Sequence, residues 1–186
     1  MPVFRKLFPA ERGHYRDHLL RLGVSDRYAR FAGTVGDAVI DRHVARMDWT
    51  RTTVIAAVER GAIVGAVELC TDRTVWPDNA EIAISVEAAH QSGGIGSVLV
   101  RRALTVARNR SVARVHLLCL AENRRMRAMM RRLGARQEAD GGEVTAIVEL
   151  PRPSQYSLAL EALEDGAGAV NSLLDHMHGG RALRAA

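Results

Sequence analysis

The sequence has very little lysine and few aromatic residues. Lys6 is the only lysine among 26 basic residues, so arginine supplies almost all of the formal net charge of +5. A basic surface of this kind favours anionic partners, which include nucleic acids and phosphorylated cofactors. Aromatic residues make up only 4% of the chain, and no nucleic-acid-binding motif is present. Because single-stranded nucleic acids are usually held by aromatic stacking, we do not expect a nucleic-acid partner.

Long apolar runs are also missing. The longest ones, such as residues 54–58 and 62–67, fall far short of the roughly 20 residues that a membrane-spanning helix needs. The first residues lack the basic and then apolar layout of a signal peptide. We therefore expect a cytoplasmic protein with no membrane partner.

Cysteine is scarce, and the histidines do not form a ligand pattern. Cys70 and Cys119 are isolated in apolar segments, which favours two buried free thiols over a disulfide. His176 and His178 lie in the C-terminal tail without further clustered ligands, so we expect no metal site.

The apolar patterns predict an α/β protein, of the mixed α+β kind, with a mixed sheet covered by helices on both faces. We expect residues 1–150 to form one domain and residues 151–186 to form a C-terminal helical extension, broken near Gly166 and Gly168. The expected strands are 3–7, 52–58, 62–69, 80–86, 115–120, 137–138 and 143–150, and the expected helices are 9–22, 25–31, 37–47, 95–109 and 123–133.

A glycine-rich turn between a strand and a helix is the most informative segment. Gly94 and Gly96 let the backbone approach an anion without hindrance from a Cβ atom, and the N–H groups at the start of the following helix are hydrogen-bond donors. This geometry suits a pyrophosphate. The lysine of a P-loop is missing, and so is the full glycine spacing of a dinucleotide-binding fold.

The Q-x-x-G-x-G pattern at Gln91, Gly94 and Gly96 resembles the coenzyme A motif of the GNAT superfamily of N-acyltransferases. The helix at 95–109, the strand at 114–120 and the segment 123–135 extend the resemblance, which covers roughly residues 3–150. It implies a mostly antiparallel sheet whose fourth and fifth strands splay apart in a V. More narrowly, the segment 25–31 is similar to one in the acetyltransferase domain of bacterial protein-lysine acetyltransferases.

The resemblance also implies where acetyl-CoA, the expected cosubstrate, would bind. Its pantetheine arm would follow the backbone of Ile84, Ser85 and Val86 in the splay, and its pyrophosphate would lie on the loop formed by Gln91, Ser92, Gly93, Gly94, Ile95, Gly96 and Ser97. Asn123 would contact the arm near the sulfur. An ordinary helix cap is an equally good interpretation of Asn123, and one side chain can do both.

Glu81 is the candidate catalytic base. An alkyl ammonium with a pKa near 10.4 is mostly protonated at neutral pH, and removing its proton costs about 4 to 5 kcal/mol. The resemblance places Glu81 where many relatives keep a catalytic glutamate. The alternative is a solvated strand residue or a partner for an arginine. Glu87 has the same strand parity and is interpreted as a polar edge residue.

Met130 departs from the family pattern, because many members have a tyrosine there that is thought to protonate the thiolate. Tyr28 would replace it only if the N-terminal helices fold over the site, and we expect Tyr28 in the core instead. His116 and Cys119 could form a nucleophilic pair, but a spacing of three on a strand directs them to opposite faces.

The sequence therefore predicts an N-acetyltransferase that transfers an acetyl group from acetyl-CoA to a primary amine in a ternary complex. The acceptor is a protein lysine or a small-molecule amine. A non-catalytic acyl-CoA-binding regulatory module is the alternative from another class, because the tyrosine is missing. The apolar residues of the tail are also compatible with a homodimer.

Overall fold

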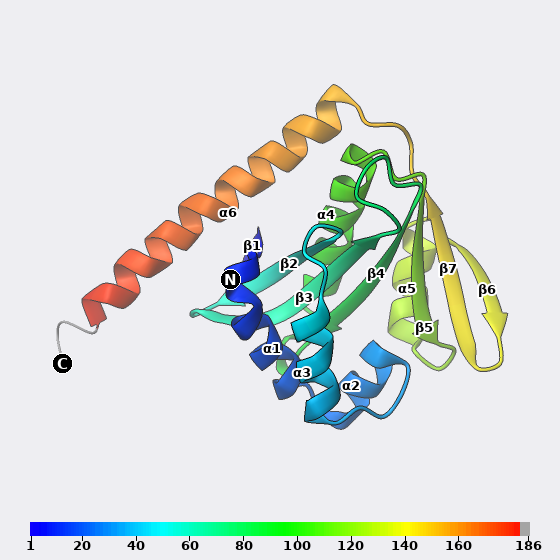
Figure 1. The fold of residues 1–186 in the computed structure, drawn as a ribbon, viewed down its shortest axis with the longest axis horizontal. Coiled ribbons are helices and arrows are strands. Elements are labelled where there is room, and N and C mark those ends of the chain that lie inside the picture. Colours follow the sequence, from blue (N-terminus) through cyan, green and yellow to red (C-terminus); the bar gives the residue numbers. More distant parts are fainter. Residues whose placement is uncertain (183–186) are drawn as a thin grey trace.

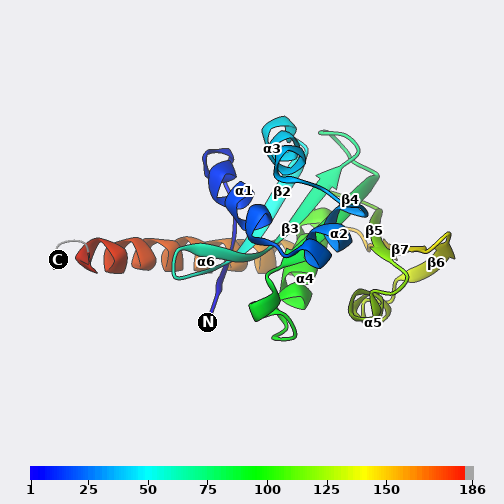
Figure 2. The same ribbon diagram turned by 90° about the horizontal axis from the view of Figure 1, so that it is seen from below.

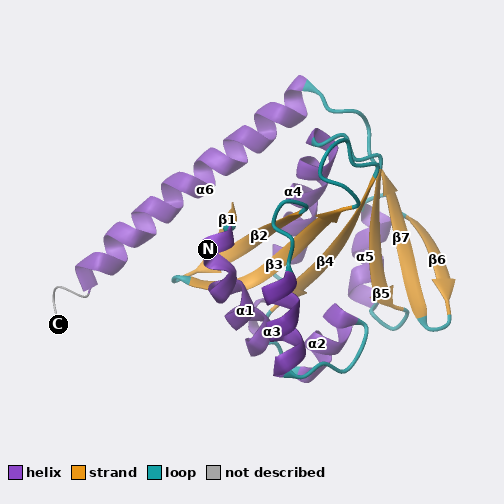
Figure 3. Ribbon diagram, in the orientation of Figure 1, coloured by secondary structure: helices purple, strands orange, loops and turns teal. Residues whose placement is uncertain are grey.

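The structure, a computed structural model, describes the backbone of residues 1–182 and the side chains of residues 1–168. Within this part of the chain, seven strands form one sheet and six helices surround it (Figure 1; Figure 3). The elements in chain order are β1 (Val3–Lys6), α1 (Arg12–Arg21), α2 (Val24–Phe31), α3 (Asp37–Arg46), β2 (Thr52–Glu59), β3 (Ala62–Thr71), β4 (Asn79–Val86), α4 (Ile95–Asn109), β5 (Arg114–Leu120), α5 (Arg124–Arg132), β6 (Arg136–Asp140), β7 (Glu143–Glu149) and α6 (Gln155–Ala182).

The sheet is mixed and mostly antiparallel, as the sequence predicts. Its strand order is β1-β2-β3-β4-β5-β7-β6, and β4 and β5 are the parallel pair. These two strands pair only from Asn79↔Arg114 to Ile82↔Leu117, although β4 continues to Val86 and β5 to Leu120. The predicted V-shaped splay between the fourth and fifth strands is therefore confirmed.

Helices cover the sheet on both faces (Figure 2). Helices α4 and α5 pack against one face, called the α4–α5 face, around the fully buried Leu99 and Met130. Helices α1 and α3 pack against the other, called the α1–α3 face, around the fully buried Leu19 and Ile40. The two clusters exist because successive side chains of a strand point to opposite faces, and β2 and β3 are buried on both.

The C-terminal extension differs from its prediction. It forms one continuous helix, α6, with no break at Gly166 or Gly168. A Cβ atom at Gly168 would lie 2.9 Å from Arg5 Cβ and 3.0 Å from Phe4 O. The glycine thus lets α6 pack closely on β1, and this contact offsets the roughly 1 kcal/mol by which glycine disfavours a helix interior.

Polar contacts also hold the first half of α6 on the domain. Lys6 Nζ lies 2.5 Å from Glu161 Oε1 and 2.7 Å from Asp165 Oδ2. Asn109, at the end of α4, donates to Glu161 Oε2 at 2.6 Å. In the described part of the chain, the extension therefore docks on its own domain. No described helix is both long and apolar enough to cross a bilayer.

The two cysteines differ in exposure. Cys119 is buried among apolar side chains of the α4–α5 face, as predicted, but the prediction for Cys70 was wrong. Cys70 lies on the α1–α3 face near the end of β3, beyond the area that the helices cover. Its apolar neighbours in the sequence therefore gave a wrong indication that its side chain is buried.

A buried charge cluster joins the N-terminal helices to the sheet. Glu68 on β3 accepts a hydrogen bond from Tyr15 in α1 (2.5 Å), contacts His43 in α3 (2.8 Å), and lies 2.8 Å from Arg30 Nη2 in α2. Only 6% of the Arg30 side chain and 9% of that of Glu68 are exposed. Burial alone would raise the pKa of Glu68, but the charge of Arg30 and the contact with His43 lower that pKa to about 2.

We expect Glu68→Gln to lower the free energy of unfolding by about 3 kcal/mol, because it leaves the Arg30 charge buried without a counter-ion. Urea denaturation measures the change. Glu81→Gln is the matched control, since Glu81 is an exposed carboxylate on the neighbouring strand and its loss should cost less than about 0.5 kcal/mol. Equal losses in the two variants would contradict the role of the buried pair.

The same cluster predicts a dependence of stability on pH. The folded-state pKa of Glu68, about 2, lies below its ordinary value of 4.5, so the folded protein binds fewer protons there than the unfolded chain. Its contribution is complete above about pH 4.5 and is lost as the pH falls toward 2. Acid titration followed by circular dichroism should show a smaller loss of stability over this range in Glu68→Gln than in the unsubstituted protein.

Candidate active site

The glycine-rich loop forms the turn that the sequence predicts. Gly94 has φ +84°, a left-handed conformation that glycine adopts without strain, and it precedes the first residue of α4. Gly96 lies against β4, where an added Cβ would be 3.4 Å from Ile84 Cδ1. The first residue thus reverses the chain, and the second lets α4 begin directly beside the strand.

The start of α4 presents unpaired donors. The first backbone hydrogen bond of the helix runs from Val98 N to Gly94 O (3.1 Å). Among the described residues, the N–H groups of Ile95, Gly96 and Ser97 have no backbone acceptor. These groups, together with the helix dipole, favour an anion at this end of α4.

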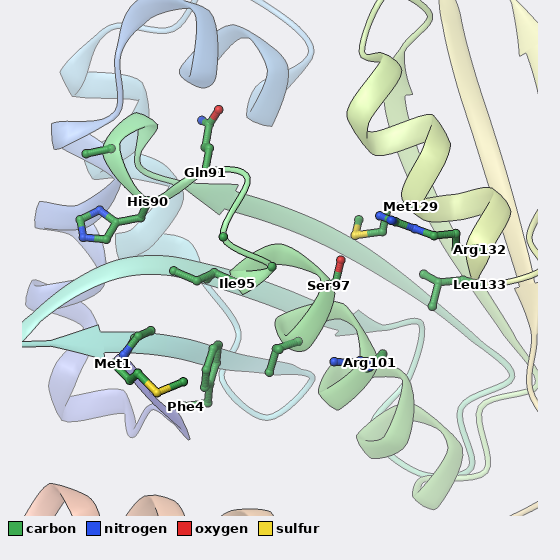
Figure 4. Close-up of a pocket in the computed structure, with 15 residues that line it drawn as sticks. Met1, Phe4, His90, Gln91, Ile95, Ser97, Arg101, Met129, Arg132 and Leu133 are labelled. Atoms are coloured by element: carbon green, nitrogen blue, oxygen red, sulfur yellow. The ribbon is translucent and has the colours of Figure 1, made fainter.

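A cavity of about 740 Å³, called the α4–α5 cavity, adjoins this loop. Figure 4 shows Ser97 and Arg101 on α4 facing Met129 and Arg132 on α5, and Leu133 directly after it, across this cavity. The two guanidinium groups add positive charge beside the loop donors. Neither arginine could be assigned to this cavity from the sequence, because only the tertiary fold brings α5 opposite α4.

Backbone groups of β4 point into the splay beyond Ile82. The Glu87 N–H donates to Val64 O at 2.9 Å and continues the register between β3 and β4. Because backbone groups alternate in direction along a strand, those of Ile84 and Val86 point away from β3 and into the splay. The carbonyl of Val86 accepts a hydrogen bond from Gln91 Nε2 there (2.9 Å).

The backbone groups of Ser85 point the opposite way, toward β3. Its side chain is buried against α1, where its hydroxyl lies 2.9 Å from His18 Nε2. His18 also contacts Glu87 Oε1 at 3.1 Å, and Glu87 pairs with Arg21 at 2.9 Å. Burial lowers the pKa of His18, although the contact with Glu87 opposes this shift. These residues hold α1 on the sheet, and Glu87 is therefore more than a polar edge residue.

Glu81 lies on the α1–α3 face, next to the point where the strands separate. It pairs in register with Cys70 on β3 and His116 on β5. Its side chain is exposed, and no ion pair joins it to another of the described residues. The arginine partner considered from the sequence is thus not found within them, and the carboxylate is accessible from this face.

Gln91 and Asn123 have structural partners near the mouth of the splay. Gln91 Nε2 donates to Asp26 Oδ1 at 2.9 Å, and Gln91 Oε1 accepts from Arg125 at 2.7 Å, so this side chain links α2, the loop and α5. Asn123 Oδ1 accepts from the Met126 N–H at 3.1 Å and caps α5. The amide nitrogen of Asn123 is not needed for the cap.

Tyr28 differs from its prediction. It is 41% exposed rather than part of the core, because α2 packs against β4 and β5 near the splay. It lines a second cavity of about 820 Å³, called the α2–α5 cavity, together with Leu120 and Asn123. The sequence could not indicate this position, which depends on how α2 folds back over the sheet.

Met130 is fully buried on the α4–α5 face, and its sulfur lies 4.0 Å from Cys119 Sγ. His116 occupies the opposite face, so the predicted separation of His116 and Cys119 is confirmed. No cluster of three metal-ligating side chains occurs among the described residues. The side chains of His176 and His178 lie outside the described residues.

Comparison with known proteins defines the class. Residues 17–135 match the family model described as "Acetyltransferase (GNAT) family". The chain therefore belongs to the GNAT acetyltransferase family, whose members carry out acyl transfer that depends on acetyl-CoA.

The fold resembles several solved structures. The GNAT domain of S. lividans PAT is 22% identical with a TM-score of 0.68, over 79% of this chain and 89% of that one. The PaiA N-acetyltransferase of Thermoplasma acidophilum in complex with coenzyme A is 14% identical with a TM-score of 0.58, over 80% and 99%. The ribosomal-protein-S18-alanine N-acetyltransferase of Escherichia coli is 16% identical with a TM-score of 0.61, over 83% and 97%. These likenesses confirm the predicted fold.

Proposed function

We propose that this protein is an N-acetyltransferase that transfers the acetyl group of acetyl-CoA to a primary amine by direct attack in a ternary complex. One observation carries the proposal: the splay opens between the glycine-rich loop at the start of α4 on one side and the accessible carboxylate of Glu81 on the α1–α3 face. A cofactor and an amine that approach from opposite faces would meet there.

The residues of the loop and the splay fit coenzyme A. The N–H groups of Ile95, Gly96 and Ser97 would bind the pyrophosphate, with Arg101 and Arg132 nearby in the α4–α5 cavity. The pantetheine arm would follow β4, where the backbone groups of Ile84 and Val86 have no strand to pair with. When bound, acetyl-CoA supplies an activated thioester.

A group of the protein or a water molecule can be assigned to each chemical step that would follow the binding of acetyl-CoA and the amine. Glu81 would accept the proton of the ammonium, directly or through a water molecule. The amine nitrogen then attacks the thioester carbon, and the Val86 N–H, which points into the splay, would stabilise the oxyanion. The thiolate leaves as the carbonyl reforms. The nitrogen loses its second proton and the sulfur gains one. Met130 has no proton to give, so a water molecule or the hydroxyl of Tyr28 would relay this proton from the nitrogen to the thiolate.

A protein lysine is the acceptor we favour. The segment from Ser25 to Phe31 is similar to one in bacterial protein-lysine acetyltransferases, and it forms α2, beside the mouth of the splay. The open α1–α3 side also leaves room for a polypeptide. A small-molecule amine would use the same groups.

Cofactor binding tests the first half of the proposal. We expect Gly94→Glu to weaken acetyl-CoA binding by at least tenfold in calorimetry, because a carboxylate at the start of α4 repels the pyrophosphate. Gly94→Gln is the matched control, since it adds a side chain of the same size at the same φ of +84° without the charge. No binding by the unsubstituted protein, or equal losses in both variants, would refute the assigned loop.

Amine-dependent release of coenzyme A thiol tests the second half. We expect Glu81→Gln to reduce the rate 10²- to 10⁴-fold while the affinity for acetyl-CoA stays unchanged, because the amide cannot accept the proton. The loss should shrink as the pH approaches the pKa of the amine, where free amine is already present. A protein that binds acetyl-CoA but transfers it to no amine would instead be a regulatory binding module.

A further inference from the structure

One part of the sheet has none of the described helices over it. On the α4–α5 face, β5 and β7 bury Val115, Leu117 and Val148. Because strand side chains alternate, the residues between them point to the α1–α3 side. Helices α1 and α3 lie over β2 and β3 on that side, and α2 contacts β4 and β5 near the splay. Figure 2 shows no described helix over the rest of β5 or over β7 and β6 there.

This surface, called the bare face, is defined by the strand registers. Leu118 opposes Thr145, which opposes Glu138, and His116 opposes Ile147, which opposes Arg136. Leu118 is 50% exposed, a high value for a leucine in the middle of a strand. The bare face therefore offers apolar contact area as well as polar groups.

The charge of the bare face is opposite to that of the protein as a whole. Together with the adjoining Glu81, it bears more carboxylates than basic groups, although the chain has a net charge of +5. The carboxylates are those of Glu81, Glu138, Asp140, Glu143 and Glu149, and the arginines are Arg114 and Arg136. Among the described residues, an ion pair engages only Glu138, with Arg136. Helix α5, on the other side of the same strands, carries five arginines and no acid.

The bare face is continuous with the candidate catalytic base. Glu81 on β4 is next to His116 on β5, and Asp140 lies on β6, three strands away. Strands are spaced about 4.8 Å apart, so the surface extends roughly 14 Å from Glu81 across the strands, and Asp140 lies a further four residues along them. This length exceeds a small amine and matches about four residues of extended polypeptide.

Resting on the function proposed above, we propose that the bare face docks a basic, extended polypeptide segment whose lysine is the acceptor. The apolar side chains of Leu118 and Ile147 pack against this segment, and the carboxylates attract its cationic side chains. The basic residues that matter most lie about four positions from the acceptor lysine.

A binding measurement tests this surface separately from catalysis. The probe is a fluorescent ten-residue peptide with one central lysine and arginines four positions to either side, titrated by anisotropy into the protein saturated with coenzyme A. We expect the double variant Glu138→Gln and Glu149→Gln to raise Kd about tenfold, because two of the attracting charges are removed. The midpoint of thermal unfolding, measured by circular dichroism, should stay within a few degrees of that of the unsubstituted protein, both in this double variant and in the control described next.

The matched control changes the net charge by the same amount, but at positions outside the bare face. Asp17→Asn with Asp165→Asn removes two exposed carboxylates of α1 and α6, and we expect Kd to change less than twofold. Equal effects of the two double variants would overturn the proposal, because only the overall charge would matter. A peptide with glutamates in place of the arginines should bind at least tenfold more weakly.

Other outcomes separate this proposal from the proposed function. Acetylation of amines without measurable binding of the basic peptide would overturn the docking surface alone. Peptide binding that follows the expected pattern, in a protein that acetylates no amine, would support the surface and refute the transfer reaction. Self-association that Glu138→Gln and Glu149→Gln abolish would identify a second copy as the occupant and overturn the proposal.

Discussion

The loss of pairing between β4 and β5 after Ile82 is the constraint on which the site depends. Beyond it, β4 has hydrogen-bonding backbone groups on one edge and no strand to satisfy them, which is a costly arrangement in the interior of a sheet. In this structure the amide of Gln91 satisfies one of them, the Val86 carbonyl. The remaining groups form an extended row of donors and acceptors that a linear, amide-containing ligand can complete like a missing strand.

The two sides of this opening are held apart by different forces. On the α4–α5 face, apolar packing around Leu99 and Met130 holds α4 and α5 against the strands. On the other face, the buried pair of Glu68 and Arg30 anchors α2, which carries no buried apolar residue of its own. The helix nearest the mouth of the splay is therefore held by polar contacts that include this buried ion pair, and the pair limits how far the helix can shift without exposing a buried ion.

Features decided by neighbouring residues could be predicted from the sequence. Gly94 must adopt a positive φ to turn the chain into α4, and the apolar spacing of that helix specifies its buried stripe. The cap at Asn123 follows from the same local chemistry. The splay between the parallel strands β4 and β5 was predicted from the resemblance to the family, since no local pattern in the sequence specifies which strands pair.

Features decided by contacts between distant residues could not be predicted. Glycine ordinarily disfavours a helix, yet Gly168 is needed where α6 meets β1, and only the folded structure reveals that contact. The exposure of Cys70 and Tyr28 depends on where α2 and α3 end over the sheet. The link from Gln91 to Asp26 and Arg125 likewise joins three segments that no sequence window contains.

The packing of α6 on β1 has a consequence for how the molecule is made. An uncovered edge strand is a template for unwanted pairing with other chains, and here Lys6 is bound by Glu161 and Asp165. The segment that protects this edge is synthesised more than 150 residues after the strand it covers. During translation the nascent sheet therefore keeps a vulnerable edge until α6 leaves the ribosome, and this long-range closure comes late in folding.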